Sequence, residues 1–298
     1  MISETELQKR IEAAYKLLEE CRVCPRECGV NRLKNDKLGF CRSGLNPVLA
    51  SVSAHHGEEP PLSGTKGSGT IFFTNCNLKC VYCQNYPISQ MGNGEERTLA
   101  EVACQMLWLQ DQGCHNLNLV TPTHFMPQIL KSLALARERG FNLPIVYNTS
   151  GYESVESLRL LDGIVDIYLP DMRYSDNAAA MKYSIAPHYP EINRAAILEM
   201  YRQVGNLELD NHGISKRGLL VRHLVLPGGI SGTEGVMKFL AEEISTKVYI
   251  SLMAQYFPAY KATEFKELSR RVTAEEYQEA CEIMEKYGLE NGWVQEFE

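Results

Sequence analysis

The sequence predicts an α/β fold: a partial (β/α)6 barrel of the TIM type, preceded by an N-terminal cysteine-rich, metal-binding extension. Two observations support this prediction. From about residue 69 onward, short apolar runs alternate with amphipathic segments, the pattern of parallel βα units. Six such runs occur without a glycine-rich dinucleotide fingerprint, which favours a barrel or an open partial barrel. In such folds the chemistry lies at the carboxyl ends of the strands.

The elements follow from the period of the apolar residues. Strands are expected at 70–74, 116–120, 145–148, 164–169, 219–226 and 247–252. Helices are expected at 99–112, 126–139, 154–161, 176–184, 190–204, 233–244 and 274–287. Thr98 and Thr273 each stand three residues before a glutamate, which is the capping-box pattern of a helix start.

The first part of the chain has a different character. Ser3 and Glu6 form a capping-box pattern ahead of a helix that reaches about Glu20. The next forty residues are loop-like and rich in Cys, Gly, Pro and Arg, with one short strand at 48–52. We therefore expect two domains: a helix and cysteine-rich metal-binding module at 1–68, and the barrel with a C-terminal helix at 69–298.

Composition narrows the functional class. The 298 residues are 44% hydrophobic and carry a net charge of −7 without a sustained basic run, so nucleic acid is not expected as a partner. No apolar stretch approaches the roughly 18–20 residues that span a bilayer, and the start lacks the pattern of a signal peptide. A cytoplasmic protein that has no membrane partner is expected.

Ten cysteines are the most informative count. A chain of this length can fold on a conventional core, so metal binding is a better interpretation than a disulfide framework. Seven of the ten form two groups. The first group is Cys21, Cys24, Cys28 and Cys41, and the second is Cys76, Cys80 and Cys83.

The second group directly follows the first predicted barrel strand, so its three thiolates share one loop and can reach one metal centre. Three cysteines leave the fourth position of a cubane cluster or a tetrahedral zinc open for water or substrate. The alternative is a structural zinc loop.

The spacing C-x3-C-x2-C after the first strand, with an aromatic residue before the last cysteine, resembles the signature of radical S-adenosylmethionine (radical SAM) enzymes. The resemblance implies a [4Fe-4S] cluster on the three cysteines, S-adenosylmethionine on its open iron, and Tyr82 beside the adenine. It also implies reductive cleavage to a 5′-deoxyadenosyl radical that abstracts hydrogen from a substrate, with an electron donor of the flavodoxin or ferredoxin type. Oxygen sensitivity and an anaerobic setting follow from an exposed cluster iron.

Three further stretches are similar to motifs of glycyl-radical activating enzymes such as pyruvate formate-lyase activating enzyme. They are Gln84-Asn85, Asp171-Met-Arg173, and Arg222-His223 ahead of Pro227-Gly228. The resemblance implies that Asp171 helps bind S-adenosylmethionine and that Arg173, which replaces a lysine of the family, has a catalytic role. His223 is a candidate for the cofactor site and for catalysis, with a structural strand histidine as the alternative.

Two strand ends depart from the family pattern. Thr121-Pro-Thr-His124 stands where relatives carry a Gly-Gly-Glu-like stretch, so Thr121 is a candidate cofactor contact and His124 a candidate catalytic residue. Asn148 and Ser150 follow the third strand and are similar to a turn that touches the cofactor in relatives. The alternative is a plain turn with a helix cap.

The first cysteine group offers four thiolates within 21 residues, which make a closed site. Either a structural zinc or a second [4Fe-4S] cluster fits, and the spacing does not separate them. Together with the second group, this stretch resembles the PflX-like branch of activating-enzyme-like oxidoreductases. Between the groups, His55-His56-Gly-Glu58-Glu59 is expected to line the cleft.

Three functions remain open from the sequence. The first is hydrogen abstraction from a glycyl or peptide site of a partner protein. The second is the same chemistry on a small molecule. The third is a non-catalytic iron–sulfur protein that serves electron transfer or sensing.

Overall fold

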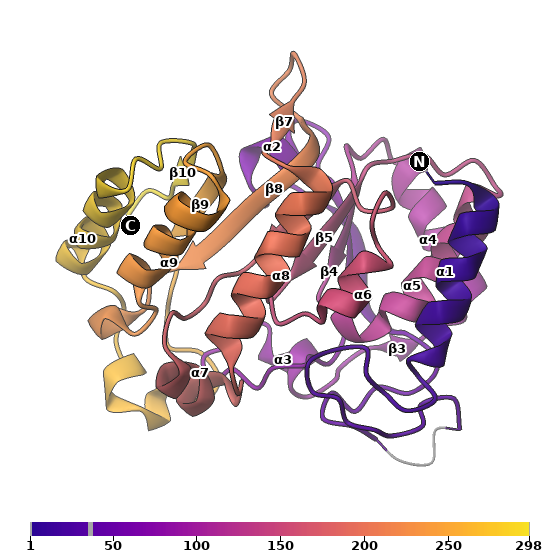
Figure 1. Ribbon diagram of the computed structural model, residues 1–298, viewed down its shortest axis with the longest axis horizontal. Helices are drawn as coiled ribbons and strands as arrows, with labels where there is room; N and C mark the ends of the chain where they lie inside the picture. The colour runs from indigo at the N-terminus through magenta and orange to yellow at the C-terminus, as the bar shows by residue number, and fades with distance from the viewer. Residues whose placement is uncertain (1, 35–37, 298) are drawn as a thin grey trace.

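A mixed sheet with a parallel centre organises the chain (Figure 1). The computed structural model describes residues 2–34 and 38–297. Within these ranges the strand order is β10-β9-β8-β6-β5-β4-β2-β1-β3, with β7 beside β8. The parallel centre consists of β2 (Ser68–Phe73), β4 (Leu117–Val120), β5 (Ile145–Thr149), β6 (Ile167–Pro170), β8 (Ser215–Leu224) and β9 (Tyr249–Met253).

The six predicted strands are these six parallel strands, and each lies beside the next one along the chain. The predicted α/β class with a mostly parallel sheet is therefore confirmed. Within the described ranges no strand pair joins the two ends of the sheet, which remains open between β10 and β3. The partial barrel stays a prediction.

Short strands extend the sheet at its edges. β1 (Val48–His55) runs antiparallel to β2 and carries β3 (Glu95–Glu96) on its other side. At the opposite edge β10 (Gly292–Val294) runs parallel to β9, while β7 (Glu208–Leu209) pairs antiparallel with β8. The sequence did not predict β3, β7 or β10, because two or three residues carry no recognisable alternation.

Helices connect the parallel strands and lie outside the sheet (Figure 1). They are α1 (Glu4–Lys16), α2 (Pro60–Ser63), α3 (Tyr86–Ser89), α4 (Leu99–Asp111), α5 (Met126–Arg137), α6 (Val155–Arg159), α7 (Asn177–Ser184), α8 (Tyr189–Val204), α9 (Thr233–Phe239) and α10 (Ala274–Lys286). At Thr98 and Thr273 both hydrogen bonds of the capping box form: the threonine side chain accepts from the glutamate amide, and the glutamate side chain accepts from the threonine amide. At Ser3 only the first of these bonds forms, from the amide of Glu6. The helix predicted at 233–244 continues past α9 as a π-helical turn, Leu240–Ile244.

The core lies between the sheet and these helices. All five residues of β5 are buried, as expected for a central strand covered on both faces. Helix α1 packs on α5, which packs on α4, so the N-terminal helix belongs to the outer layer of the same core.

The cysteine-rich stretch after α1 lies at the carboxyl ends of the parallel strands, at the lower right of Figure 1. Arg26 Nε donates to the carbonyl of Asn77 at 2.8 Å, and Arg32 Nη1 donates to the carbonyl of His124 at 2.6 Å. These contacts attach it to the loops that follow β2 and β4. The predicted division at residue 68 stays a prediction, and its outer limits, residues 1 and 298, lie outside the described residues.

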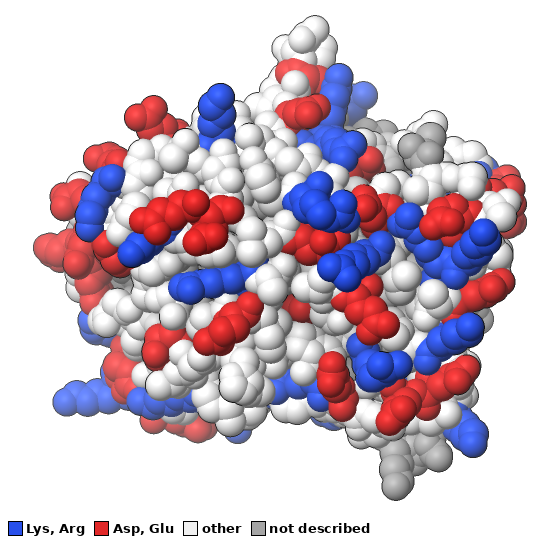
Figure 2. All heavy atoms as spheres, viewed as in Figure 1, with Lys and Arg blue, Asp and Glu red and all other residues white. Residues whose placement is uncertain are grey.

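Charged side chains of both signs cover the surface seen in Figure 2. Acidic and basic side chains are interspersed over the face drawn in Figure 2. In the part of the chain that the structure describes, no helix combines the length and apolar character needed to cross a bilayer.

Candidate functional site

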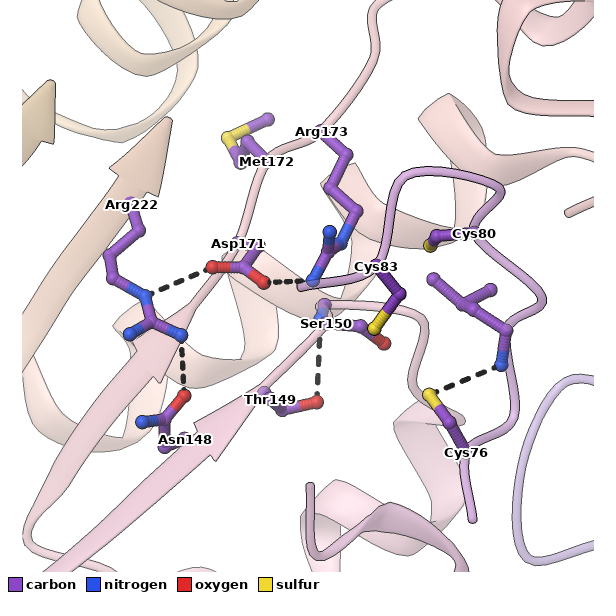
Figure 3. Close-up of polar contacts among 12 residues, drawn as sticks. Cys76, Cys80, Cys83, Asn148, Thr149, Ser150, Asp171, Met172, Arg173 and Arg222 are labelled. Atoms are coloured by element: carbon purple, nitrogen blue, oxygen red, sulfur yellow. Dashed lines mark hydrogen bonds and ion pairs between the residues drawn. The ribbon is translucent and has the colours of Figure 1, made fainter. Parts of the chain in front are cut away.

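Charged side chains meet where three neighbouring parallel strands end. Arg222 on β8 donates from Nε to Asp171 Oδ1 at 3.0 Å and from Nη2 to Asn148 Oδ1 at 2.6 Å. Arg173 Nη2 donates to the other oxygen of Asp171 at 2.5 Å (Figure 3). Asp171 directly follows β6 and Asn148 belongs to β5, so the parallel register itself brings these residues together.

The two arginines of this cluster are largely buried, so each guanidinium group needs a carboxylate partner. Burial alone would lower the pKa of Arg222, but the carboxylates of Asp171, Glu59 and Glu58 outweigh it and hold the pKa above its usual value. For Arg173, burial also lowers the pKa, but the negative charge of Asp171 outweighs burial and keeps the pKa well above its usual value. Both guanidinium groups are therefore fixed cations at neutral pH.

The second cysteine group lies beside this cluster. Cys76, Cys80 and Cys83 belong to the loop between β2 and α3, and Figure 3 shows that loop next to Arg173. Each sulfur already has a polar neighbour: the amide of Leu78 donates to Cys76 at 3.4 Å, Ser184 Oγ donates to Cys80 at 3.0 Å, and Ser89 Oγ lies 3.1 Å from Cys83.

The chemistry of these thiols fits an iron–sulfur cluster. Burial raises the pKa of Cys76 to about 12, and the charge of the neighbouring Cys80 contributes to this shift. Burial also raises the pKa of Cys80. Such thiols are protonated without a cation and lose their protons to a bound metal. No three His, Cys, Asp or Glu side chains in the described ranges are grouped for a single ion. A cluster, by contrast, takes each thiolate on a different iron, so its ligands stand further apart.

A chain of hydroxyl groups leads from the aromatic residue of the loop to one of its sulfurs. Tyr82 Oη lies 2.6 Å from Tyr174 Oη, which lies 2.7 Å from Ser184 Oγ, the donor to Cys80. Burial raises the pKa of Tyr82 and of Tyr174. Tyr82 also contacts Tyr256 edge-on, with ring centroids 5.9 Å apart.

A cavity of about 170 Å³ separates the cysteine loop from the charged cluster. Its lining includes Tyr82, Cys83, Asp171, Arg173 and Arg222. An aromatic ring, a thiol, a carboxylate and two guanidinium groups thus face one space, which suits a ligand with an apolar ring and an anionic end.

His223 is placed elsewhere. It follows Arg222 on β8, so its side chain points to the opposite face of the sheet. Its Nδ1 donates to the carbonyl of Met172 at 2.7 Å, and its Nε2 accepts from Thr233 at 3.0 Å. Burial lowers the pKa of His223 to about 4, so the ring is neutral. The structure does not bring His223 to the cavity, and its cofactor and catalytic roles stay predictions.

The stretch after β4 does not line the cavity beside Cys83. His124 Nε2 donates to the carbonyl of Thr74 at 2.8 Å, and burial lowers the pKa of His124 to about 3. Thr121 adopts a left-handed backbone with φ of 60°, and its amide donates to the carbonyl of Asn148 at 2.9 Å. Ser150 is buried, with its Oγ 3.5 Å from Asn77 Oδ1 in the cysteine loop.

A buried carboxylate near this stretch was not predicted. Glu153 is 2% exposed, and its Oε1 accepts from Thr123 Oγ1 at 2.5 Å and from Thr149 Oγ1. Its Oε2 has no hydrogen-bond partner in the described part of the chain. Burial raises the pKa of Glu153 to about 7, so it titrates near neutrality.

Arg26 lies near Cys24 and Cys28 of the first cysteine group. Burial raises the pKa of Cys21 and, more strongly, that of Cys24, and Cys41 adds to both shifts through its charge. Cys28 Sγ accepts from the amide of Phe40 at 3.3 Å. Burial lowers the pKa of Arg26, while the charges of Tyr152, Cys24 and Cys76 oppose that shift, so Arg26 lies between the two cysteine groups.

Sequence reasoning selected His223 and left its neighbour Arg222 out of the site. The sequence did carry a signal for Arg222. Successive side chains of a strand point to opposite faces, and an arginine inside an apolar strand needs a buried partner on its own face. Ser184 and Glu153 had no such signal, since one ends a helix and the other lies in a turn far along the chain from the cysteine loop.

Comparisons with known proteins identify the superfamily of the central part of the chain. The model of the radical SAM superfamily matches residues 70–205, which include the cysteine loop, Asn148, Asp171 and Arg173. The uncharacterized protein MJ0674 of Methanocaldococcus jannaschii is 33% identical over 297 residues, which cover 95% of this chain and 80% of the relative. The chain carries a radical SAM superfamily domain.

A second uncharacterized protein of the same organism, MJ0808, is 25% identical over 86% of this chain and 78% of its own length. Among solved structures, a radical SAM methyltransferase from Sphaerobacter thermophilus superposes with a TM-score of 0.52 at 16% identity. The superposition covers 76% of this chain and 65% of the methyltransferase, so this chain spans less than two thirds of that protein. Radical SAM proteins are enzymes that use an iron–sulfur cluster to cleave S-adenosylmethionine, and this one shares their fold.

Proposed function

We propose that this radical SAM enzyme holds its [4Fe-4S] cluster on Cys76, Cys80 and Cys83 and abstracts a hydrogen atom from a substrate in the adjoining cavity. The observation that carries the proposal is the shared space between Cys83 on one side and Asp171, Arg173 and Arg222 on the other. When bound, the cluster supplies the electron that cleaves the sulfonium of S-adenosylmethionine and so generates the 5′-deoxyadenosyl radical.

The residues around the cavity have separate tasks. Arg173 presents a guanidinium held by Asp171, which suits the methionine carboxylate of S-adenosylmethionine. Tyr82 offers an apolar ring for the adenine at the end of the cavity nearest Cys83. Arg222 is clamped by Asp171 and Asn148, so its position is fixed before any ligand binds.

Burial of the cysteine loop has a further consequence. Tyr82, which lines the cavity, is 3% exposed, so bulk water has little access to this part of the lining. Exclusion of water protects a carbon radical from side reactions until it meets the substrate.

A glycyl or peptide site of a partner protein is the substrate class that we propose first. The support is the resemblance of Asp171-Met-Arg173 and of the Arg222 strand to the motifs of activating enzymes. A small molecule is the second candidate, and the size of the cavity, about 170 Å³, favours it, because so small a space leaves little room for a peptide loop.

For the first cysteine group we propose a closed metal site, either a second [4Fe-4S] cluster or zinc. The buried thiols of Cys21, Cys24 and Cys41 support a metal site. Zinc would require these thiols to draw together, because no three such side chains in the described ranges are grouped for one ion. A flavodoxin or ferredoxin is the proposed electron donor, and the cytoplasm the proposed location.

The test is formation of 5′-deoxyadenosine by anaerobically reconstituted protein with dithionite and S-adenosylmethionine. We expect product from the wild type and from Cys104→Ala, which changes an exposed cysteine far from the loop, and none from Cys83→Ala. Equal product from Cys83→Ala and the wild type would refute the assignment of the cluster ligands.

A further inference from the structure

A second cavity continues the first beyond Arg222. It has a volume of about 310 Å³, and it shares Arg222, Met253 and Gln255 with the cavity beside Cys83. Glu58 and Glu59, from the loop after β1, also line it. We call this second cavity the acidic pocket. A ligand that filled both cavities would reach from the cysteine loop to these two carboxylates.

One oxygen of the Glu59 carboxylate is buried without a hydrogen bond. Glu59 is 9% exposed, and its Oε2 has no hydrogen-bond partner among residues 2–34 and 38–297. Native proteins rarely leave such an oxygen unpaired, because it loses its hydration and receives no donor in return. Glu59 lines the acidic pocket, so a donor bound there would satisfy this oxygen once the carboxylate turns toward it.

Arg222 makes no hydrogen bond to Glu59. Its Nε and Nη2 are already used by Asp171 and Asn148, as Figure 3 shows, and its Nη1 faces Glu58 Oε2 at 3.8 Å. With all five groups ionised, Arg173 and Arg222 supply two positive charges against the three carboxylates of Asp171, Glu58 and Glu59. The excess of one negative charge is what a bound cation would neutralise.

The rest of the lining suits an elongated organic cation. Trp293 on β10 presents an indole, and Gln255 and Gln295 present amide groups at the same cavity. Aromatic and amide walls around a carboxylate are the surroundings in which alkylammonium and alkylguanidinium groups bind.

We infer that the acidic pocket binds a cationic group of the substrate, an ammonium or a guanidinium, through Glu59 with support from Glu58, and thereby aims the attached carbon chain at the cavity beside Cys83. The inference rests on the proposed function for the identity of the ligand as a substrate. Both a lysine or arginine side chain of a peptide and a small amine or guanidine carry this group.

Calorimetric titration of the cluster-loaded protein tests the inference with four probes. Two are small molecules, pentylguanidinium and its neutral isostere pentylurea. The other two are the peptides Ac-Gly-Arg-Gly-NH2 and the same peptide with citrulline in place of arginine. Each probe is titrated into the wild type, Glu59→Gln, and Glu208→Gln, which removes an exposed carboxylate on β7.

We expect the wild type and Glu208→Gln to bind the cationic member of at least one pair about tenfold more tightly than its neutral isostere, as one charge-assisted hydrogen bond provides. Glu59→Gln should abolish that preference. Tighter binding of the peptide would assign the cation to a protein substrate, and tighter binding of pentylguanidinium would assign it to a small molecule. Equal binding of cation and isostere by the wild type, or a preference that survives Glu59→Gln, would overturn the inference.

The same preparations are assayed for 5′-deoxyadenosine, so that the two proposals fail separately. Wild type that cleaves S-adenosylmethionine without a preference for cations contradicts only the inference. Wild type that prefers cations but yields no 5′-deoxyadenosine contradicts the proposed function and leaves the acidic pocket as a cation site.

Discussion

Arg222 Nε donates to Asp171 Oδ1 at 3.0 Å across the ends of β8 and β6, two strands that lie side by side in the sheet. The two residues also form an isolated parallel bridge through their backbones. The ion pair is thus built into the register of the sheet, and Arg173 joins it from the loop that follows. This explains how a largely apolar core can hold two guanidinium groups next to a cysteine loop.

Removal of the shared carboxylate tests how much this cluster contributes to stability. Asp171→Ala leaves Arg173 and Arg222 without their common partner, so the free energy of unfolding should fall by about 3 kcal/mol or more. Urea denaturation measures it. As a control, Asp162→Ala breaks an exposed pair with Arg202, at 2.6 Å, and should cost much less. Equal losses in the two variants would show that the Asp171 cluster is not a buried network.

Glu153 predicts a pH dependence of stability. Its pKa is about 7 in the folded chain against the ordinary 4.5, so the folded state binds more protons than the unfolded state between these values. The contribution of Glu153 to the free energy of unfolding is therefore greatest below about pH 4.5. It falls as the pH rises to about 7 and levels off above that. At pH 8 the penalty approaches about 3 kcal/mol as an upper limit.

Glu153→Gln should remove that penalty, because an amide oxygen still accepts from Thr123 and Thr149. We expect the variant to be more stable than the wild type at pH 8 and similar to it at pH 5, measured by urea denaturation at both values. Glu156→Gln, on the exposed side of α6, should change neither. A variant that is less stable at pH 8 would mean that Glu153 is paired with a group other than the two threonines.

The hydroxyl chain that ends on Cys80 predicts a change in the cluster's reduction potential. Hydrogen bonds to sulfur stabilise the more negative, reduced state. Ser184→Ala removes the donor that lies 3.0 Å from Cys80 and should lower the potential by about 40 mV, the one-electron equivalent of a hydrogen bond worth about 1 kcal/mol. A redox titration followed by electron paramagnetic resonance measures it. Ser269→Ala, on the surface, serves as the control. An unchanged potential in Ser184→Ala would separate Cys80 from the cluster.

The sequence predicted the parallel strands well because each is an apolar run flanked by turn signals, as at 145–148. The strand boundaries shifted where the chain begins or ends pairing outside the apolar run. β8 begins at Ser215, four residues before its predicted start, because Ser215 and Arg217 pair with β7. Local pattern cannot show which neighbour a strand will find.

For the site, the sequence was informative wherever chemistry is concentrated in one short segment. The cysteine loop and Asp171-Met-Arg173 stood out for that reason. Glu153 and Ser184 did not, because their partners lie on other elements and only the folded chain brings them together. Arg222 and His223 lie between these cases, since the choice between them depended on which face of β8 turns inward.

The central claim is that the loop after β2 carries the catalytic cluster and that the first cysteine group is a separate site. Iron and sulfide content after anaerobic reconstitution tests it most directly, in the wild type, Cys76→Ala and Cys24→Ala. The account predicts that Cys76→Ala loses about four irons and all formation of 5′-deoxyadenosine, whereas Cys24→Ala retains the cluster signal that responds to S-adenosylmethionine. Full iron content in Cys76→Ala, or loss of that signal only in Cys24→Ala, would contradict it.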